Sequence, residues 1–225
     1  VSTDTDLLNF NLNSIKNLSA ANSFDGYVQL QGLQPNSFGN ASFSFEVPVI
    51  GYRKNLKPSI SIVYSSNSSN SVLGYGFVLG GISSIYVDSR FGTPHFSDEK
   101  DIFSFDGVRL EKKSEKTSSL TTVISYEPLK QTDFSKIEHI IEKSDESGNY
   151  QKNYWVVKKK NGNKVYFGNE QNSWEGIDEN RKSAWFISTE YDKFSNKIEY
   201  EYTKSFGTSH ISTILWGNYG MNFSY

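Results

Sequence analysis

The stretch that decides the fold is residues 154–168, which read YWVVKKKNGNKVYFG. Two runs rich in aromatic and β-branched residues flank the dipeptide Asn161-Gly162. Asn-Gly between two such runs is a strong short-range signal for a β-hairpin, because both residues of the tight turn need positive φ angles. The segment therefore predicts two antiparallel strands joined at Gly162, with Trp155 in the first of them.

The same two-residue period recurs along the rest of the chain. Apolar and polar side chains alternate in several other runs, which are residues 43–49, 60–64, 185–191, 198–202 and 221–225. Residues 134–141 fit both helical and strand spacing, and the turn-like residues after them favour a strand. We predict an all-β fold of antiparallel hairpins or a meander, forming a curved sheet or a sandwich-like fragment of a larger β-shell.

Three segments break this alternation. Residues 1–22 are polar and rich in Asn and Ser, so we expect a flexible leader before a β domain at 23–225. Residues 65–71 contain only Ser and Asn, and residues 111–122 are charged and rich in Ser and Thr, so both are predicted to be loops. The last alternating run continues to the final residue, which leads us to expect a fragment of a longer protein.

Composition narrows the classes of function. Of the 225 residues 15% are aromatic, which is too many for a disordered chain, and 23 basic against 25 acidic residues give no excess that favours nucleic acid. The absence of Cys excludes disulfides and thiolate chemistry. No apolar run reaches the ~18 residues of a membrane helix. We expect neither a cofactor nor a bound metal.

Two glycines and two turns stand out as structural positions. Gly74 and Gly76 lie two apart, which removes side chains from one face of the chain, so another backbone or a large ring is expected to approach there. Asp106-Gly107 is typical of a hairpin turn. Asn196 closes the turn-rich segment between the runs at 185–191 and 198–202.

Several segments in a fixed order resemble one known family. They are 39–49 (GNASFSFEVPV), 56–65 (LKPSISIVYS), 74–77 (GYGF), 105–110 (FDGVRL), 155–168, 185–202 and 211–217 (ISTILWG). This order is similar to that of the amino-terminal domain family of the Salmonella virulence plasmid B protein (SpvB), which is shared with B components of insecticidal toxin complexes and some Rhs/YD-repeat proteins. Here Phe77 replaces the usual Trp, and Ser195 replaces a Gly. The motif positions are Pro58, Tyr64, Gly74, Gly76, Phe77, Asp106, Gly107, Trp155, Gly162, Trp185 and Asn196.

The resemblance implies a structural role. In toxin-complex relatives the domain forms curved β-sheet that helps to wall a hollow shell around a toxic peptide, and in the virulence protein it precedes a separate ADP-ribosyltransferase domain. The expected protein is thus a non-catalytic segment of a secreted bacterial toxin-like protein. Its expected partners are the remainder of its own chain, such as a YD-repeat shell and a toxin domain, or another toxin-complex subunit.

Alternatives from other classes remain open. Tyr and Trp alternating along strands also suit a protein- or carbohydrate-binding module. Glu199-Tyr200-Glu201 matches the Glu-x-Glu pair of arginine ADP-ribosyltransferases, although both Glu residues also occupy the outward positions of a strand. Glycan binding would favour the module, and turnover of NAD would favour the enzyme.

The remaining polar clusters have ordinary explanations as well as functional ones. Carboxylates suit Ca²⁺, but neither acidic group has full calcium-loop spacing. The lone histidines fit ordinary surface or core positions, and Lys158-Lys159-Lys160 fits either phosphate contact or protection of a sheet edge. These candidates are Asp98, Glu99 and Asp101, then Asp145, Glu146 and Asn149, then His95, His139 and His210.

Overall fold

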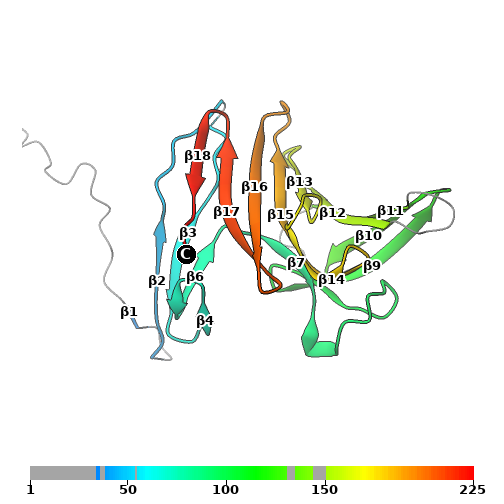
Figure 1. Cartoon of the computed structure of the whole chain (residues 1–225), viewed down its shortest axis with the longest axis horizontal. Helices are drawn as coiled ribbons and strands as arrows, with labels where there is room; N and C mark the ends of the chain where they lie inside the picture. The colour runs from blue at the N-terminus through cyan, green and yellow to red at the C-terminus, as the bar shows by residue number, and fades with distance from the viewer. Residues whose placement is uncertain (1–33, 36–38, 54, 131–134, 144–150) are drawn as a thin grey trace, which may run out of the picture.

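The chain folds almost entirely as antiparallel β-sheet (Figure 1). The computed structural model describes residues 34–35, 39–53, 55–130, 135–143 and 151–225. Within these ranges the regular structure is strand apart from one 3₁₀ turn at Ser89–Phe91, which confirms the predicted all-β class. No helix of the described ranges is long and apolar enough to cross a membrane. The predicted leader at 1–22 and the acidic turn at 145–149 lie outside the described residues.

A small sheet contains the first strands in the order β1-β2-β3-β6. They are β1 Gln34–Pro35, β2 Ala41–Glu46, β3 Ser61–Ser65 and β6 Phe77–Gly80. β2 and β3 form the predicted hairpin, with Phe43 opposite Tyr64. Between β3 and β6, β4 (Asn70–Ser71) pairs with β5 (Gly74–Tyr75), so the predicted Ser/Asn loop ends in a short strand.

The second sheet contains twelve strands. Its strands are β7 Ser84–Val87, β8 Phe103–Phe105, β9 Val108–Thr117, β10 Thr121–Pro128, β11 Lys136–Lys143, β12 Gln151–Lys158, β13 Lys164–Phe167, β14 Trp174–Asp178, β15 Arg181–Tyr191, β16 Lys197–Ser205, β17 Thr208–Trp216 and β18 Tyr219–Asn222. Each strand from β7 to β13 pairs with the next one in the chain, as a meander does. The ambiguous segment around 136–141 is a strand, as favoured above.

Strand β15 closes this meander into a barrel. Residues 184–186 of β15 pair with β7, and residues 187–191 pair with β13. The strands β7 to β13 and β15 therefore form a closed circuit, while β16, β17 and β18 continue the sheet outward from β15. A register shift between Tyr166 and Phe167 of β13 accompanies the closure, since a bulge lets a strand bend away from one partner.

The core fills the barrel and extends beneath the small sheet. Inward-facing residues of the barrel are fully buried, among them Trp155, Ile85 and Ile137 at 0% exposure. The small sheet lies beside β17 and β18 (Figure 1), where the indole Nε1 of Trp216 donates to the Ile50 carbonyl at 2.8 Å. Apolar residues before and after that carbonyl, including Val49, pack against the same core.

The prediction of a loop at 111–122 is wrong. These residues form most of β9 and the start of β10, which pair through Thr117 and Thr122. Beyond Leu110 every residue of β9 is exposed, so no apolar face marks the strand in the sequence. Ion pairs such as Lys112–Glu115 at 2.8 Å line its surface instead.

The two glycines of the 74–77 motif have different roles. Gly76 has φ of +82°, and a Cβ there would lie 2.7 Å from Cε2 of Tyr64, so a ring does approach as predicted. Gly74 has φ of +102° but no heavy atom within 4 Å of a Cβ position. The expected close approach at Gly74 is therefore wrong, and this glycine serves only the backbone angle.

We expect Gly76→Ala to destabilise the domain by about 1–3 kcal/mol more than Gly74→Ala. Both substitutions carry the backbone penalty of positive φ, about 1–2 kcal/mol, but only the first overpacks against Tyr64. Urea unfolding of the two variants measures the difference, with Ser68→Ala as a surface control. Equal losses for the two glycines would contradict the assigned contact.

Candidate functional site

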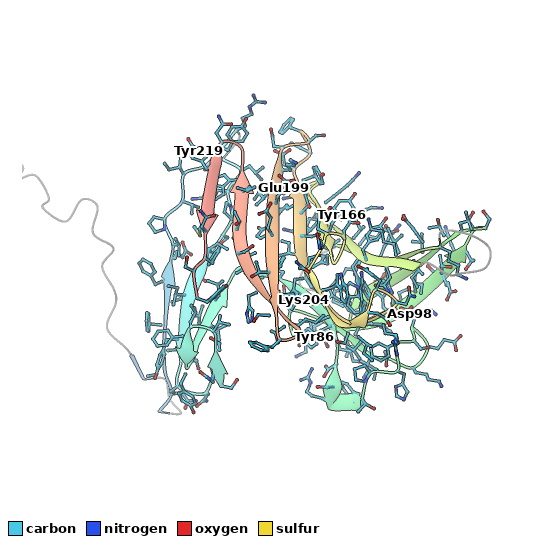
Figure 2. All side chains as sticks on the ribbon, in the orientation of Figure 1. Tyr86, Asp98, Tyr166, Glu199, Lys204 and Tyr219 are labelled. Carbon is cyan, nitrogen blue, oxygen red and sulfur yellow. The ribbon has the colours of Figure 1, made fainter. Side chains whose placement is uncertain are left out.

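A loop between the 3₁₀ turn and β8 inserts an acid into the end of the barrel. Asp98 on this loop, labelled in Figure 2, accepts a hydrogen bond from the Tyr126 hydroxyl at 3.0 Å. The same oxygen lies 2.7 Å from Nδ1 of His139, whose side chain is 4% exposed. Asp98 and His139 are separate candidate site residues in the sequence. They are 41 residues apart, and the barrel brings the loop that carries Asp98 against His139 of β11.

The electrostatics of this contact follow from burial and hydrogen bonding. Burial alone would raise the pKa of the Asp98 carboxyl, but the hydrogen bond and charge of His139, together with the Tyr126 hydroxyl, outweigh it and hold the pKa below its usual range. Burial, followed by the charge of Asp98, raises the pKa of Tyr126 well above its ordinary value. The tyrosine is therefore a hydrogen-bond donor at all physiological pH values.

Aromatic rings surround the histidine. The His139 ring stacks on Trp155 with centroids 4.3 Å apart and planes at 6°. Phe103 and Trp185 contact the same indole edge-on, at 5.0 and 5.9 Å. Within the described residues His139 Nε2 and Trp155 Nε1 are buried without a hydrogen-bond partner.

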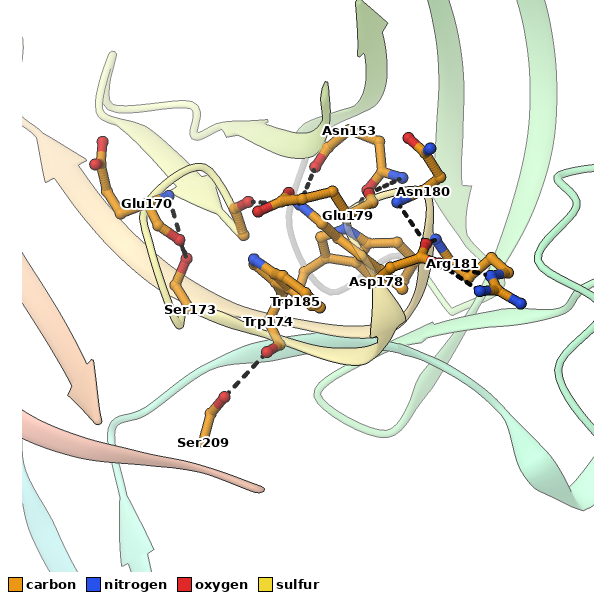
Figure 3. A network of polar contacts seen from close by, with 12 residues as sticks. Asn153, Glu170, Ser173, Trp174, Asp178, Glu179, Asn180, Arg181, Trp185 and Ser209 are labelled. Atoms are coloured by element: carbon orange, nitrogen blue, oxygen red, sulfur yellow. Dashed lines mark hydrogen bonds and ion pairs between the residues drawn. The ribbon is translucent and has the colours of Figure 1, made fainter. Parts of the chain in front are cut away.

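A second polar cluster lies beside the first (Figure 3). It joins the start of β15 to β12 and to Gly168, the residue after β13. The Lys182 side chain is 1% exposed, and its Nζ donates to the carbonyls of Asn153 at 3.2 Å and Gly168 at 3.4 Å. It also forms an ion pair with Glu179 at 3.0 Å. Asn153 Oδ1 accepts from the indole Nε1 of Trp185 at 2.8 Å. Burial lowers the pKa of Lys182 despite the carboxylate of Glu179.

The two clusters share a small cavity. Its volume is about 70 Å³, and its walls include Asp98, His139, Asn153, Lys182 and Trp185. A cavity of this size holds a few water molecules and no larger substrate. Within the described residues His139 Nε2 meets no hydroxyl, so the Asp98–His139 pair is not extended to a nucleophile. The cluster is suited to holding the loop and strands together.

The predicted motif positions fall into three separate places. Tyr64 and Phe77 of the small sheet contact each other with ring centroids 4.9 Å apart, and Pro58, which precedes β3, is fully buried. Trp155 and Trp185 lie inside the barrel. The motif therefore marks the small-sheet cluster, the hairpin turns and the barrel core, and these do not converge on one site.

The hairpin turns hold the remaining motif positions. Asp106 has φ of +46° and its Oδ1 accepts from the backbone N–H of Ser84 at 2.8 Å, while Gly107 follows with φ of +85°. Gly162 has φ of +90° in the turn between β12 and β13, as predicted. The backbone N–H and the side-chain Nδ2 of Asn196 donate to Asp192 at 2.9 and 2.8 Å.

The other candidates lie apart from the Asp98 and Lys182 clusters. Glu199 and Glu201 line a groove of about 350 Å³ together with Ser188 and Thr189. Glu199 accepts from Lys197 at 2.6 Å, and Glu201 is exposed, which fits the outward positions expected of a strand. Asp101 accepts backbone N–H groups of its own loop, and in the described ranges no three His, Asp or Glu side chains group as a metal site. The His210 ring lies 5.6 Å from the ring of Tyr225.

Sequence reasoning missed Asn153 and Lys182 as site residues. A signal exists for Asn153. It points to the same side of β12 as Trp155 and Val157, which face the barrel interior, and a residue at such a position is usually apolar. Lys182 has no comparable signal, since a lysine at the start of a strand is usually exposed.

We expect Asp98→Asn to remove part of the acid sensitivity of the domain. The folded pKa of Asp98 is lowered, so its contribution to stability is complete above the unfolded pKa of about 3.9 and is lost as pH falls through the folded value. Urea unfolding at pH 7 and at pH 3 should show a smaller stability gap between wild type and variant at pH 3. An equal gap at both pH values would contradict the assigned pair, and exposed Glu201→Gln serves as the control.

The fold and its polar interior define a structural β domain, in which the buried polar groups bind loops and strands together. A family model described as Salmonella virulence plasmid 65kDa B protein matches residues 36–213. The chain belongs to this family. A search of curated protein sequences returned no match.

Solved structures share the fold. A crystal structure of TcdB2-TccC3 matches with a TM-score of 0.73 and 20% identity, covering 85% of this chain and 10% of that chain. The Tc holotoxin pore of Photorhabdus luminescens with a TccC3 mutation gives 0.72 and 20%, covering 84% and 10%. The N-terminal domain of the effector SpvB from Salmonella typhimurium strain LT2 gives 0.66 and 18%, covering 77% and 63%. The chain thus spans about a tenth of the length of the toxin-complex chains.

Proposed function

We propose that this domain is a non-catalytic structural segment of a longer, secreted bacterial toxin-like protein. The observation that carries the proposal is the match of 85% of the chain to a part of TcdB2-TccC3 that is only 10% of that chain. In this role the barrel and its outward sheet form part of a β-shell or scaffold that carries or encloses a toxic effector domain. Its partners are the remainder of its own chain or another toxin-complex subunit.

The interior of the barrel supports this proposal. The groups that would attract a catalytic interpretation are engaged in tertiary contacts: Asp98 with Tyr126 and His139, and Lys182 with two backbone carbonyls. Glu199 lines a groove of about 350 Å³, and there it is paired with Lys197 at 2.6 Å. These contacts stabilise the arrangement of strands and loops, which is what a wall or scaffold requires.

A chimera tests the proposal. The matching segment of TcdB2 is replaced by residues 39–225 of this chain, and assembly with TccC3 is followed by size-exclusion chromatography and electron microscopy. We expect a complex of the parental size and shape, and a chimera that carries Trp155→Ala should assemble poorly. A folded chimera that fails to enclose its partner would contradict the scaffold role. Turnover of NAD by the isolated domain, abolished by Glu199→Gln or Glu201→Gln, would overturn the non-catalytic part.

A further inference from the structure

A row of lysines crosses the outer face of the barrel. Lys136 of β11 lies directly opposite Lys158 of β12, which lies directly opposite Lys164 of β13. The row continues through Tyr191 of β15 to Lys197 of β16. All five side chains are exposed to solvent, with Lys136 at 60% and Lys197 at 52%. These five residues are called the lysine row below.

This arrangement is unfavourable for the fold by itself. Like charges directly opposite on neighbouring strands destabilise a sheet. Edge protection, one of the two interpretations considered for Lys158, does not explain the row, because β11, β12 and β13 are each paired on both sides. Charges of one sign gathered on one face create a local potential that attracts ions of the opposite sign, so this face attracts anions.

The carboxylates on this face neutralise only part of the row. Glu138 lies between two lysines and pairs with Lys136 at 2.6 Å and Lys158 at 2.7 Å. Glu199 pairs with Lys197 at 2.6 Å. Among the described residues Lys164 has no ion-pair partner. Four positive charges therefore face two negative ones, and the lysine at the centre of the row is uncompensated.

A groove extends from one end of the row. It has a volume of about 610 Å³ and runs over the outer surface of β9, β10 and β11, meeting the row at Lys136 beside its partner Glu138. Its walls add Lys113 and Lys116, and Ser114 and Ser125 lie opposite each other on its floor. Glu127 and Glu138 are the acidic residues that line it, and Lys113 pairs with Glu111 at 2.8 Å and with Glu127 at 3.7 Å. The groove thus combines cations with hydroxyl groups.

We propose that the lysine row and this groove bind an anionic polysaccharide. Successive positions of the row are one strand apart, about 4.7–4.9 Å, which is close to the length of one sugar unit in a chain. Lysine ammonium groups bind sulfate or carboxylate as point charges without a fixed geometry. Tyr191, packed edge-on against Tyr166 at 5.9 Å, offers an aromatic ring to a sugar face. The serine hydroxyls of the groove suit sugar hydroxyls.

Two other polyanions fit the surface less well. Single-stranded nucleic acid needs a series of exposed rings on which successive bases stack. Tyr191 is the exposed ring of the row, and its neighbours Tyr166 and Tyr154 on the same face are half-buried. An anionic membrane surface needs apolar side chains that insert beside the cations, and the row contains none. These ligands serve as opposing arms of the test.

The test measures binding of the domain to heparin and to polygalacturonate by calorimetry at low and at physiological salt. We expect binding that weakens with salt, because exposed charges are screened. Lys164→Glu should weaken it about tenfold or more, a loss of about 1.4 kcal/mol. Lys164 has no ion-pair partner among the described residues and lies opposite Lys158, so the substitution should not lower the melting temperature. Lys100→Glu, an exposed lysine away from the row, is the matched control.

A second variant guards against a folding defect. Lys136→Gln, Lys158→Gln and Glu138→Gln are combined, so that no buried carboxylate is left unpaired, and this variant too should lose affinity. The proposal is overturned if neither polysaccharide binds, if Lys100→Glu weakens binding as much as Lys164→Glu, or if single-stranded DNA or phosphatidylserine vesicles bind more tightly than both polysaccharides. Such a failure leaves the scaffold role intact, because the chimera tests that role independently.

Discussion

Trp155→Ala is expected to lower the free energy of unfolding by about 3–5 kcal/mol, the range for removal of a large buried aromatic side chain. The indole is 0% exposed and contacts four other rings from different parts of the barrel: His139, Tyr126, Phe103 and Trp185. Its loss leaves a cavity that these rings cannot refill, since each is fixed on its own strand. Urea unfolding followed by far-UV circular dichroism measures the change.

Tyr166→Ala provides the matched control for this prediction. Tyr166 lies on the next strand, β13, but its side chain points to the outer face, where it meets Tyr154 and Tyr191. Its removal should cost less than half as much, because water fills the space. If the two substitutions destabilise the domain equally, the interior of the barrel is not its main core.

Local pattern was sufficient to predict most strands, and it was insufficient to predict the barrel. The hairpin around Gly162 and the pairing of β2 with β3 follow from alternation and turn residues. Closure depends on β15, which divides its length between β7 and β13. This division is set by packing between distant parts of the chain. Strands β7 and β15, for example, are about 100 residues apart in the sequence. No run of residues in β15 encodes its second partner.

The polar core shows the same limit. Asp98 and His139 belong to two separate groups of candidates in the sequence, and only the barrel makes them a pair. The charged strand β9 has the sequence pattern of a loop because it has no buried face beyond Leu110. Periodicity detects burial, so a strand that is solvated on both faces carries no periodic signal.

Lys182→Met is expected to lower the free energy of unfolding by about 2–4 kcal/mol. Two carbonyls, those of Asn153 and Gly168, each lose a buried donor, and such a loss costs about 1–3 kcal/mol, while relief of the buried charge returns part of it. Lys204→Met is the matched control. The Lys204 ammonium lies 3.5 Å from the centre of the Trp174 ring, and the Lys182 ammonium lies 4.8 Å from the same point. The Lys204 side chain, however, is exposed. Its loss should be small.

The pH dependence of the same pair separates the two effects. Burial lowers the folded pKa of Lys182 below its unfolded value of about 10.4, so in the alkaline range the unfolded chain binds more protons than the folded one. The contribution of Lys182 to stability must then rise with pH. Urea unfolding at pH 7 and pH 9.5 should show a wider gap between wild type and Lys182→Met at pH 9.5. A gap that narrows with pH, or a Met variant as stable as wild type, would show that the lysine does not hold the start of β15 against β12 and Gly168.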